Sequence, residues 1–202
     1  MFIVSNVRVE EILNNLEVIR KVGVSVIRPK KAEVKPVSIS KIIVPLYEEE
    51  ECNYLSLLSF ADQFEILEEI CGSPKCFLIY DINESKISSS GFAFSINPIT
   101  CIDDEVVIEG REKLKGLKLV REFDRFIFNK KNGELIELFY YGSRPHIDTK
   151  CVEKIFRDVI KIEKVLGCEF VMIWICSEEK VQVLSVLCID VILQKSVLCR
   201  AK

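Results

Sequence analysis

A β-hairpin signal is the feature that most constrains how this chain can fold. In residues 125–141, RFIFNKKNGELIELFYY, two runs of alternating apolar and polar residues flank Asn132-Gly133. Asn-Gly readily adopts the positive φ angles of tight hairpin turns, and alternation with a period of two is typical of a strand. The stretch therefore predicts a β-hairpin, and with it an antiparallel sheet.

The segments around the hairpin predict the rest of the sheet and a helix that covers it. Residues 149–166 repeat apolar side chains with a helical period, Asp148 or Thr149 can cap their start, and Gly167 can end the helix. Alternating βαβ units are absent, so we expect an α+β fold with a mainly antiparallel sheet packed by this helix. Shorter strand-like runs occupy residues 75–82, 91–96, 105–110, 117–123, 168–176 and 181–193.

The N-terminal third is predicted to be rich in helix. Residues 7–23 form an amphipathic pattern, and residues 47–72, which include four consecutive glutamates, fit one or two further helices. Between them, residues 28–40 hold two prolines and four bases, which predicts an extended connection or an edge strand. We therefore expect an N-terminal helix–strand module with a basic, proline-containing linker at 1–46 and a main α+β domain at 47–202. Whether the module packs on the main domain stays open.

Charge is distributed unevenly along the 202 residues. The chain is 49% apolar with a formal net charge of −3, which indicates a globular protein and argues against wholesale binding to nucleic acid or a membrane surface. Residues 1–46 carry eight bases and four acids, residues 47–71 eight acids and no base, and residues 111–146 nine bases and five acids. The two basic segments could still form a local basic face.

The nine cysteines are odd in number, irregularly spaced and mostly set within apolar runs. This pattern is typical of small buried hydrophobic residues rather than of a secreted disulfide framework. The N-terminus does not resemble a signal peptide, and no run reaches the roughly 18 apolar residues of a membrane span. The sequence therefore predicts an intracellular, cytoplasmic protein in the reduced state, with a nuclear location left open. No membrane contact and no disulfide-linked partner are expected.

The sequence contains no complete motif for a metal site, a cofactor site or a catalytic nucleophile. The nearest cysteine pair, Cys71 and Cys76, lacks the second close pair that a structural zinc site needs, and no glycine-rich phosphate loop is present. We therefore expect no metal, no cofactor and no enzymatic activity. One alternative is a small enzyme whose site is assembled from scattered residues around Cys151 and the only histidine, His146.

Aromatic and basic residues gather around the hairpin and the loop after it. Cations can contact phosphates and aromatic rings can stack on unpaired bases, so this combination suits RNA. The leading hypothesis is a non-enzymatic binding factor that docks on a larger assembly of RNA or of RNA and protein, such as a ribonucleoprotein or ribosome-type particle. A protein–protein adaptor using the acidic residues 47–71 or an exposed sheet edge, without RNA, is an alternative. The predicted RNA or partner contacts are Arg28, Lys30, Lys31, Lys130, Lys131, Tyr140, Tyr141, Arg144 and His146.

Overall fold

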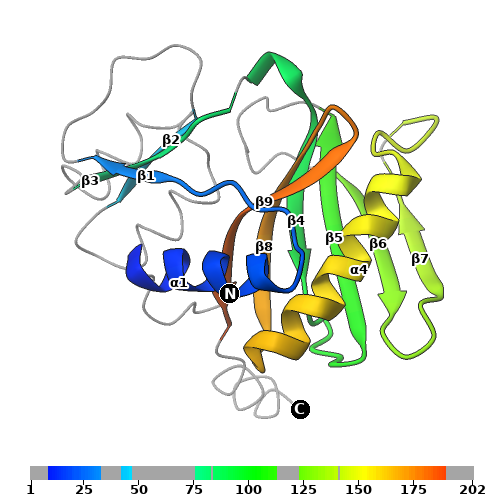
Figure 1. Ribbon diagram of the computed structural model, residues 1–202. Helices are drawn as coiled ribbons and strands as arrows, with labels where there is room; N and C mark the ends of the chain where they lie inside the picture. Colours follow the sequence, from blue (N-terminus) through cyan, green and yellow to red (C-terminus); the bar gives the residue numbers. More distant parts are fainter. Residues whose placement is uncertain are drawn as a thin grey trace.

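The main body of the protein is a six-stranded antiparallel sheet (Figure 1). The computed structural model describes residues 9–32, 42–46, 76–82, 84–112, 123–140 and 142–189. The strands follow the order β7-β6-β5-β4-β8-β9. The predicted α+β class with a mainly antiparallel sheet is confirmed. The six strands are β4 (Ile87–Phe94), β5 (Glu105–Glu112), β6 (Asp124–Asn129), β7 (Leu135–Phe139), β8 (Phe170–Ser177) and β9 (Lys180–Cys188).

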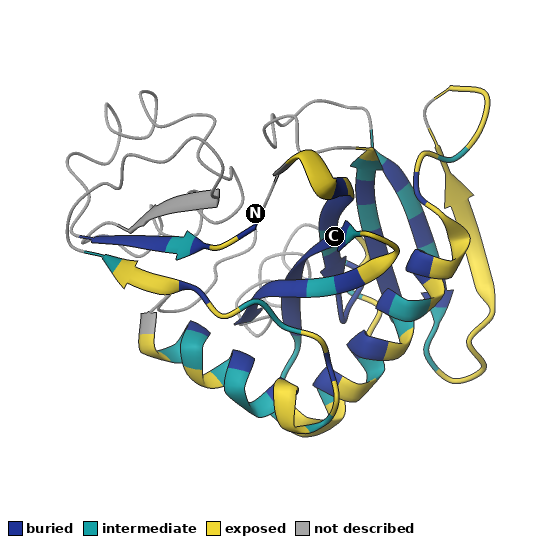
Figure 2. Ribbon diagram, turned by 45° about the horizontal axis from the view of Figure 1, so that its top comes forward, coloured by how far each residue is buried: buried dark blue, intermediate teal, exposed yellow. Residues whose placement is uncertain are grey.

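The predicted hairpin is formed by β6 and β7. The backbone N–H of Asn129 donates to the carbonyl of Glu134 at 2.9 Å, so these two residues close a loop of four residues around Asn132-Gly133. Gly133 has a φ of 72°, the left-handed conformation that its position before the second strand requires. All five residues of β7 are exposed, and β7 forms one edge of the sheet (Figure 2).

Two of the described helices lie on the same side of the large sheet (Figure 1). The helix predicted at 149–166 is α4 (Thr149–Leu166), whose N-terminus is capped by the Asp148 side chain accepting from the N–H of Lys150. Gly167 ends α4 in the left-handed conformation. The N-terminal amphipathic pattern forms α1 (Val9–Lys21), which packs against β9 and α4.

A second, smaller antiparallel sheet has the order β1-β3-β2. It consists of β1 (Lys30–Ala32), β2 (Ile42–Leu46) and β3 (Cys76–Tyr80). The helix-rich N-terminal third is not supported, because the described residues there contain α1 followed by two strands. The helices predicted within 47–72 lie outside the described residues, as does nearly all of the strand predicted at 117–123. Strands β1 and β2 lie in segments predicted to be extended, and both pair with β3.

The core fills the space between the helices and the large sheet, and Trp174 on β8 is fully buried in it. A Cβ atom at Gly110 of β5 would lie 2.5 Å from the Trp174 ring and 2.7 Å from Cδ1 of Ile147. Glycine at this position therefore lets Trp174 and Ile147 lie directly against the strand. Ile147 is 3% exposed and anchors the connection that leads into α4.

Cysteines 168 and 188 are joined by a disulfide, with their Cα atoms 6.1 Å apart. The prediction of a chain with only reduced cysteines does not hold for this pair, because the start of β8 and the end of β9 bring two positions 20 residues apart in sequence into bonding range. Within the described part of the chain, no helix is long and apolar enough to cross a membrane.

Candidate functional site

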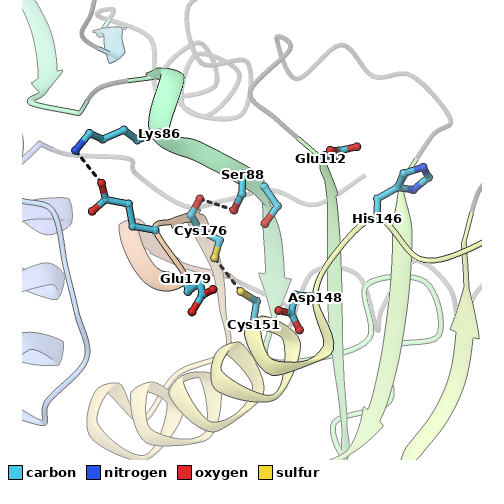
Figure 3. Close-up of a pocket in the computed structure, with 10 residues that line it drawn as sticks. Lys86, Ser88, Glu112, His146, Asp148, Cys151, Cys176 and Glu179 are labelled. Carbon is cyan, nitrogen blue, oxygen red and sulfur yellow. Dashed lines mark hydrogen bonds and ion pairs between the residues drawn. The ribbon is translucent and has the colours of Figure 1, made fainter.

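A pocket of about 450 Å³ opens beside the first turn of α4 (Figure 3). Its buried lining residues include Cys151 on α4 and Cys176 on β8, and its walls include Glu112 at the end of β5. We call it the α4 pocket. A neighbouring hollow of about 590 Å³ is formed mainly by residues 142–148 and shares Glu112, His146 and Asp148 with the α4 pocket.

Asp124, the first residue of β6, holds His146 in place. The carboxylate of Asp124 is fully buried, and its Oδ1 atom lies 3.0 Å from Nδ1 of His146. The other oxygen, Oδ2, accepts the backbone N–H groups of His146 and of Ile147, the latter at 3.0 Å. One buried carboxylate therefore satisfies three donors of the loop and fixes both its backbone and its imidazole.

This arrangement prepares His146 for proton transfer. A carboxylate bonded at Nδ1 favours the tautomer with the proton on that nitrogen, which leaves the lone pair of Nε2 free to accept a proton. The same carboxylate stabilises the imidazolium once it forms. The His146 side chain is 36% exposed and lines both hollows, so part of its imidazole is accessible to a bound molecule.

Cys151 and Cys176 form a pair of thiols in the depth of the α4 pocket, with their Sγ atoms 2.8 Å apart. Burial, the Cys176 thiol and the carboxylates of Asp148 and Glu179 raise the pKa of Cys151 to about 12. In Figure 3 the imidazole of His146 points away from Cys151. Cys151 is therefore a protonated thiol at neutral pH and does not form a nucleophile–base pair with His146, although both line one pocket.

Two glutamates at the rim occupy a strained turn. Glu178 and Glu179 connect β8 to β9 with φ angles of 51° and 63°, a conformation that Asn and Gly adopt far more easily. Both side chains line the α4 pocket. Glu178 accepts a hydrogen bond from Nζ of Lys86 at 2.8 Å, and this bond lowers the pKa of the Glu178 carboxyl. Strain of this kind is typical of functional positions.

The described lining of the α4 pocket is acidic. It contains four carboxylates, and Lys86, which is paired with Glu178, is its lysine. The other three carboxylates line the same pocket as His146. An excess of negative charge in a concave site favours a positively charged ligand. These three carboxylates belong to Glu112, Asp148 and Glu179.

The predicted RNA contacts do not form one surface. Lys130 makes an ion pair with Glu163 in the last turn of α4, whereas Arg144 and His146 precede its first turn. Because α4 has 18 residues, these positions are separated by roughly 25 Å along the helix. Lys131 is paired with Asp104 at 2.5 Å, so both lysines of the hairpin loop are matched by acids of this chain.

The remaining predicted contacts are scattered. Lys30 and Lys31 are exposed on β1, in the smaller sheet. Nη1 of Arg28 lies 3.9 Å from Oε2 of Glu17 on α1. Tyr140 is 38% exposed beside the edge strand β7, while Tyr141 lies outside the described residues. Arg144 lines the hollow next to the α4 pocket, so His146 and Arg144 are the predicted residues that come together.

Sequence reasoning missed Asp124, Cys176 and the glutamates of the pocket. Asp124 did carry a signal, because it occupies an inward-facing position in the alternation of β6, whose other inward residues are Phe126 and Phe128. An acid at such a position needs a specific partner. The glutamates gave no comparable signal, since exposed acids at strand ends are common.

Comparisons with known proteins found only solved structures that resemble this chain weakly. No protein family and no curated protein matches the chain. Among 37 matching solved chains are a D-alanine–D-alanine ligase from Bacillus anthracis (10% identity, TM-score 0.39) and an L-amino acid ligase from Bacillus licheniformis (12%, 0.40). The matches cover 88% and 87% of this chain but 55% and 39% of those chains. A phosphoribosylglycinamide synthetase from Anaerococcus prevotii matches with 13% identity and a TM-score of 0.37. This match covers 86% of this chain and 41% of the synthetase.

These findings correct the leading sequence hypothesis. The named structures are ligases and a synthetase, whereas a non-enzymatic, RNA-docking factor was expected. The chain spans about half or less of their length, and likenesses this weak assign no activity to it. Within the described residues, Lys130 and Lys131, which were expected to bind phosphate, pair with Glu163 and Asp104, and the other expected contacts lie on different elements. The prediction of a non-enzymatic ribonucleoprotein factor is therefore wrong.

Proposed function

We propose that the protein is a small general acid–base enzyme that acts on a positively charged small molecule bound in the α4 pocket. The observation that carries this proposal is the fully buried Asp124 carboxylate, which orients His146 at the pocket. His146 accepts a proton from the substrate, or from a water molecule beside it, at Nε2 and returns it later in the cycle.

The acidic lining supports the charge of the substrate. Glu112 and Glu179 contribute carboxylates from opposite walls, and a primary amine would pair with one or both of them. The strained turn at Glu178-Glu179 supports the same interpretation, since it holds two carboxylates at the pocket in place of the residues that the turn prefers. An intracellular, cytoplasmic location is part of the proposal, supported by four free thiols among the six described cysteines, the other two being the Cys168–Cys188 disulfide.

The single histidine makes the proposal directly testable. With imidazole-labelled protein, the ring nitrogens of His146 give one pair of NMR signals, which report its tautomer and its response to ligands. We expect the Nδ1–H tautomer, and a saturable shift when small primary amines and amino-acid amides are added but not when neutral alcohols of equal size are added. The compounds that bind are then followed for turnover, which His146→Ala should abolish and Asp124→Asn should reduce by at least tenfold.

Two substitutions test the charge assignment. Glu112→Gln and Glu179→Gln should each weaken amine binding several-fold, while Glu153→Gln, an exposed change on α4 outside the pocket, should leave it unchanged. Preference for carboxylic acids over amines, or amine binding that neither pocket variant weakens, would overturn the proposed substrate class. Turnover that persists in His146→Ala would overturn the acid–base role.

A further inference from the structure

The thiol pair in the α4 pocket is held between rigid elements. Cys151 lies in the first turn of α4 and is 6% exposed, and Cys176 lies near the end of β8 and is 2% exposed. Cys176 is fixed by pairing with β4 on one side and β9 on the other, and its carbonyl accepts a hydrogen bond from Oγ of Ser88 at 3.1 Å. Neither sulfur can move far without disturbing the packing around it.

The distance between the sulfurs suits a covalent bond between them. A disulfide is about 2.05 Å long, so the Sγ atoms, 2.8 Å apart, need to approach by only about 0.8 Å. No group of three or more metal-ligating side chains occurs in the described part of the chain, so the pair does not belong to a larger cation site there. Both sulfurs line the α4 pocket, which gives a small oxidant access to them.

We propose that Cys151 and Cys176 form a reversible disulfide in the depth of the α4 pocket and that this bond regulates ligand binding there. The second half of this inference rests on the proposed function, and the first half does not. The bond removes two thiol groups from the pocket lining. It also ties the first turn of α4, which follows His146 and Asp148 directly, to the end of β8.

The oxidant is a low-molecular-weight disulfide such as oxidised dithiothreitol. One cysteine thiolate attacks a sulfur of the oxidant and breaks its S–S bond, forming a mixed disulfide. The other thiolate then attacks the cysteine sulfur and expels dithiothreitol, which carries away two electrons and takes up two protons. Because the thiol of Cys151 ionises only at high pH beside Cys176, Asp148 and Glu179, the rate should rise about tenfold per pH unit between pH 7 and 9.

Peptide mapping of the intact protein tests bond formation. Trypsin cuts after Lys150 and Lys154, so Cys151 leaves on a peptide of its own, while Cys168 and Cys176 share the peptide 165–180. The Cys168–Cys188 disulfide already joins that peptide to 181–195. Oxidised dithiothreitol should therefore add the Cys151 peptide to this pair, with the loss of two hydrogens from the whole, and reduced dithiothreitol should release it.

Variants separate the two halves of the inference. Cys176→Ser should abolish the link to Cys151, whereas Cys101→Ser, outside the pocket, should not affect it. The NMR signal of His146, and its response to a primary amine, should change on oxidation in the unmodified protein but not in Cys176→Ser. Absence of the three-peptide species at pH 9 would overturn the disulfide while leaving the proposed enzyme intact. A disulfide that forms without changing the His146 signal or amine binding would overturn the regulation alone.

Discussion

At the scale of single residues, the Asp124 carboxylate should contribute more to stability than the imidazole it holds. Asp124→Ala leaves two backbone N–H groups and one ring nitrogen without their acceptor, and should lower the free energy of unfolding by about 2–3 kcal/mol. His146→Ala keeps both backbone bonds and should cost less than about 1 kcal/mol. Urea unfolding followed by the fluorescence of Trp174, the only tryptophan, measures both values.

A large loss of stability in His146→Ala, equal to that in Asp124→Ala, would contradict this division of roles. It would mean that the imidazole stabilises the fold and is not a group kept available for a ligand.

Individual contacts between residues are also what the sequence predicted least well. His146 was identified as a candidate because it is the only histidine, but its partner lies 22 residues earlier and was found only through the folded structure.

At the scale of elements, the conformation of the turn between β8 and β9 should lower the stability of the protein, while its two carboxylates strengthen amine binding in the α4 pocket. Replacing Glu178-Glu179 by Asn-Gly relieves two left-handed residues, each of which costs roughly 1 kcal/mol when it is not Asn or Gly. The double variant should unfold at higher urea concentration, with a gain of about 1–2 kcal/mol after the loss of the exposed Lys86–Glu178 pair. Amine binding in the α4 pocket should weaken.

A matched control separates charge from backbone conformation. Glu178→Gln with Glu179→Gln removes both charges but keeps two residues that resist positive φ, so binding should weaken without a gain in stability. Equal stability of the Asn-Gly and Gln-Gln variants, measured in the same urea series, would show that the turn is not strained and would remove one support of the proposed site.

Elements were predicted from the sequence far better than their connections. The strands and α4 follow from hydrophobic period, which is a local property, and Asp148 and Gly167 mark the helix ends as expected. The hairpin loop differed in length, because Asn129 and Glu134 close a loop of four residues, whereas a two-residue Asn-Gly turn would be closed by Lys131 and Glu134. The conformation of Glu178-Glu179 contradicts local preference and could be known only from the paired strands around it.

At the scale of the whole molecule, charge along the sequence misled because folding rearranges it. The sequence left open that the basic segments at 1–46 and 111–146 form a local basic face. Instead, Lys30 and Lys31 belong to the smaller sheet, while Lys130 and Lys131 are matched by Glu163 and Asp104. The acidic lining of the α4 pocket comes from three segments, which contribute Glu112, Asp148 and the Glu178-Glu179 turn. Only long-range pairing of the strands brings these acids together.

The same long-range packing predicts that α1 and the large sheet unfold together. Ile12, Leu16 and Ile19 of α1 are at most 1% exposed and belong to the same core as Trp174, and the side chain of Asn15 donates to the carbonyl of Val186 at 3.0 Å. Leu16→Ala should therefore destabilise the protein by about 2–5 kcal/mol, as a cavity in a shared core does.

The fluorescence of Trp174 distinguishes a shared core from an N-terminal module that folds alone, because this tryptophan lies on β8 and not on α1. In urea, Leu16→Ala should move the Trp174 transition to lower concentration without changing its slope, and the transition followed by helical circular dichroism should coincide with it. Asn14→Ala, an exposed change on the same helix, should leave both transitions within about 0.5 kcal/mol of the starting protein. An unchanged Trp174 transition in Leu16→Ala, with an earlier loss of helix, would show that residues 1–46 form a separate unit. The α4 pocket would then be built by the main domain alone, since its described lining comes from residues 86–179.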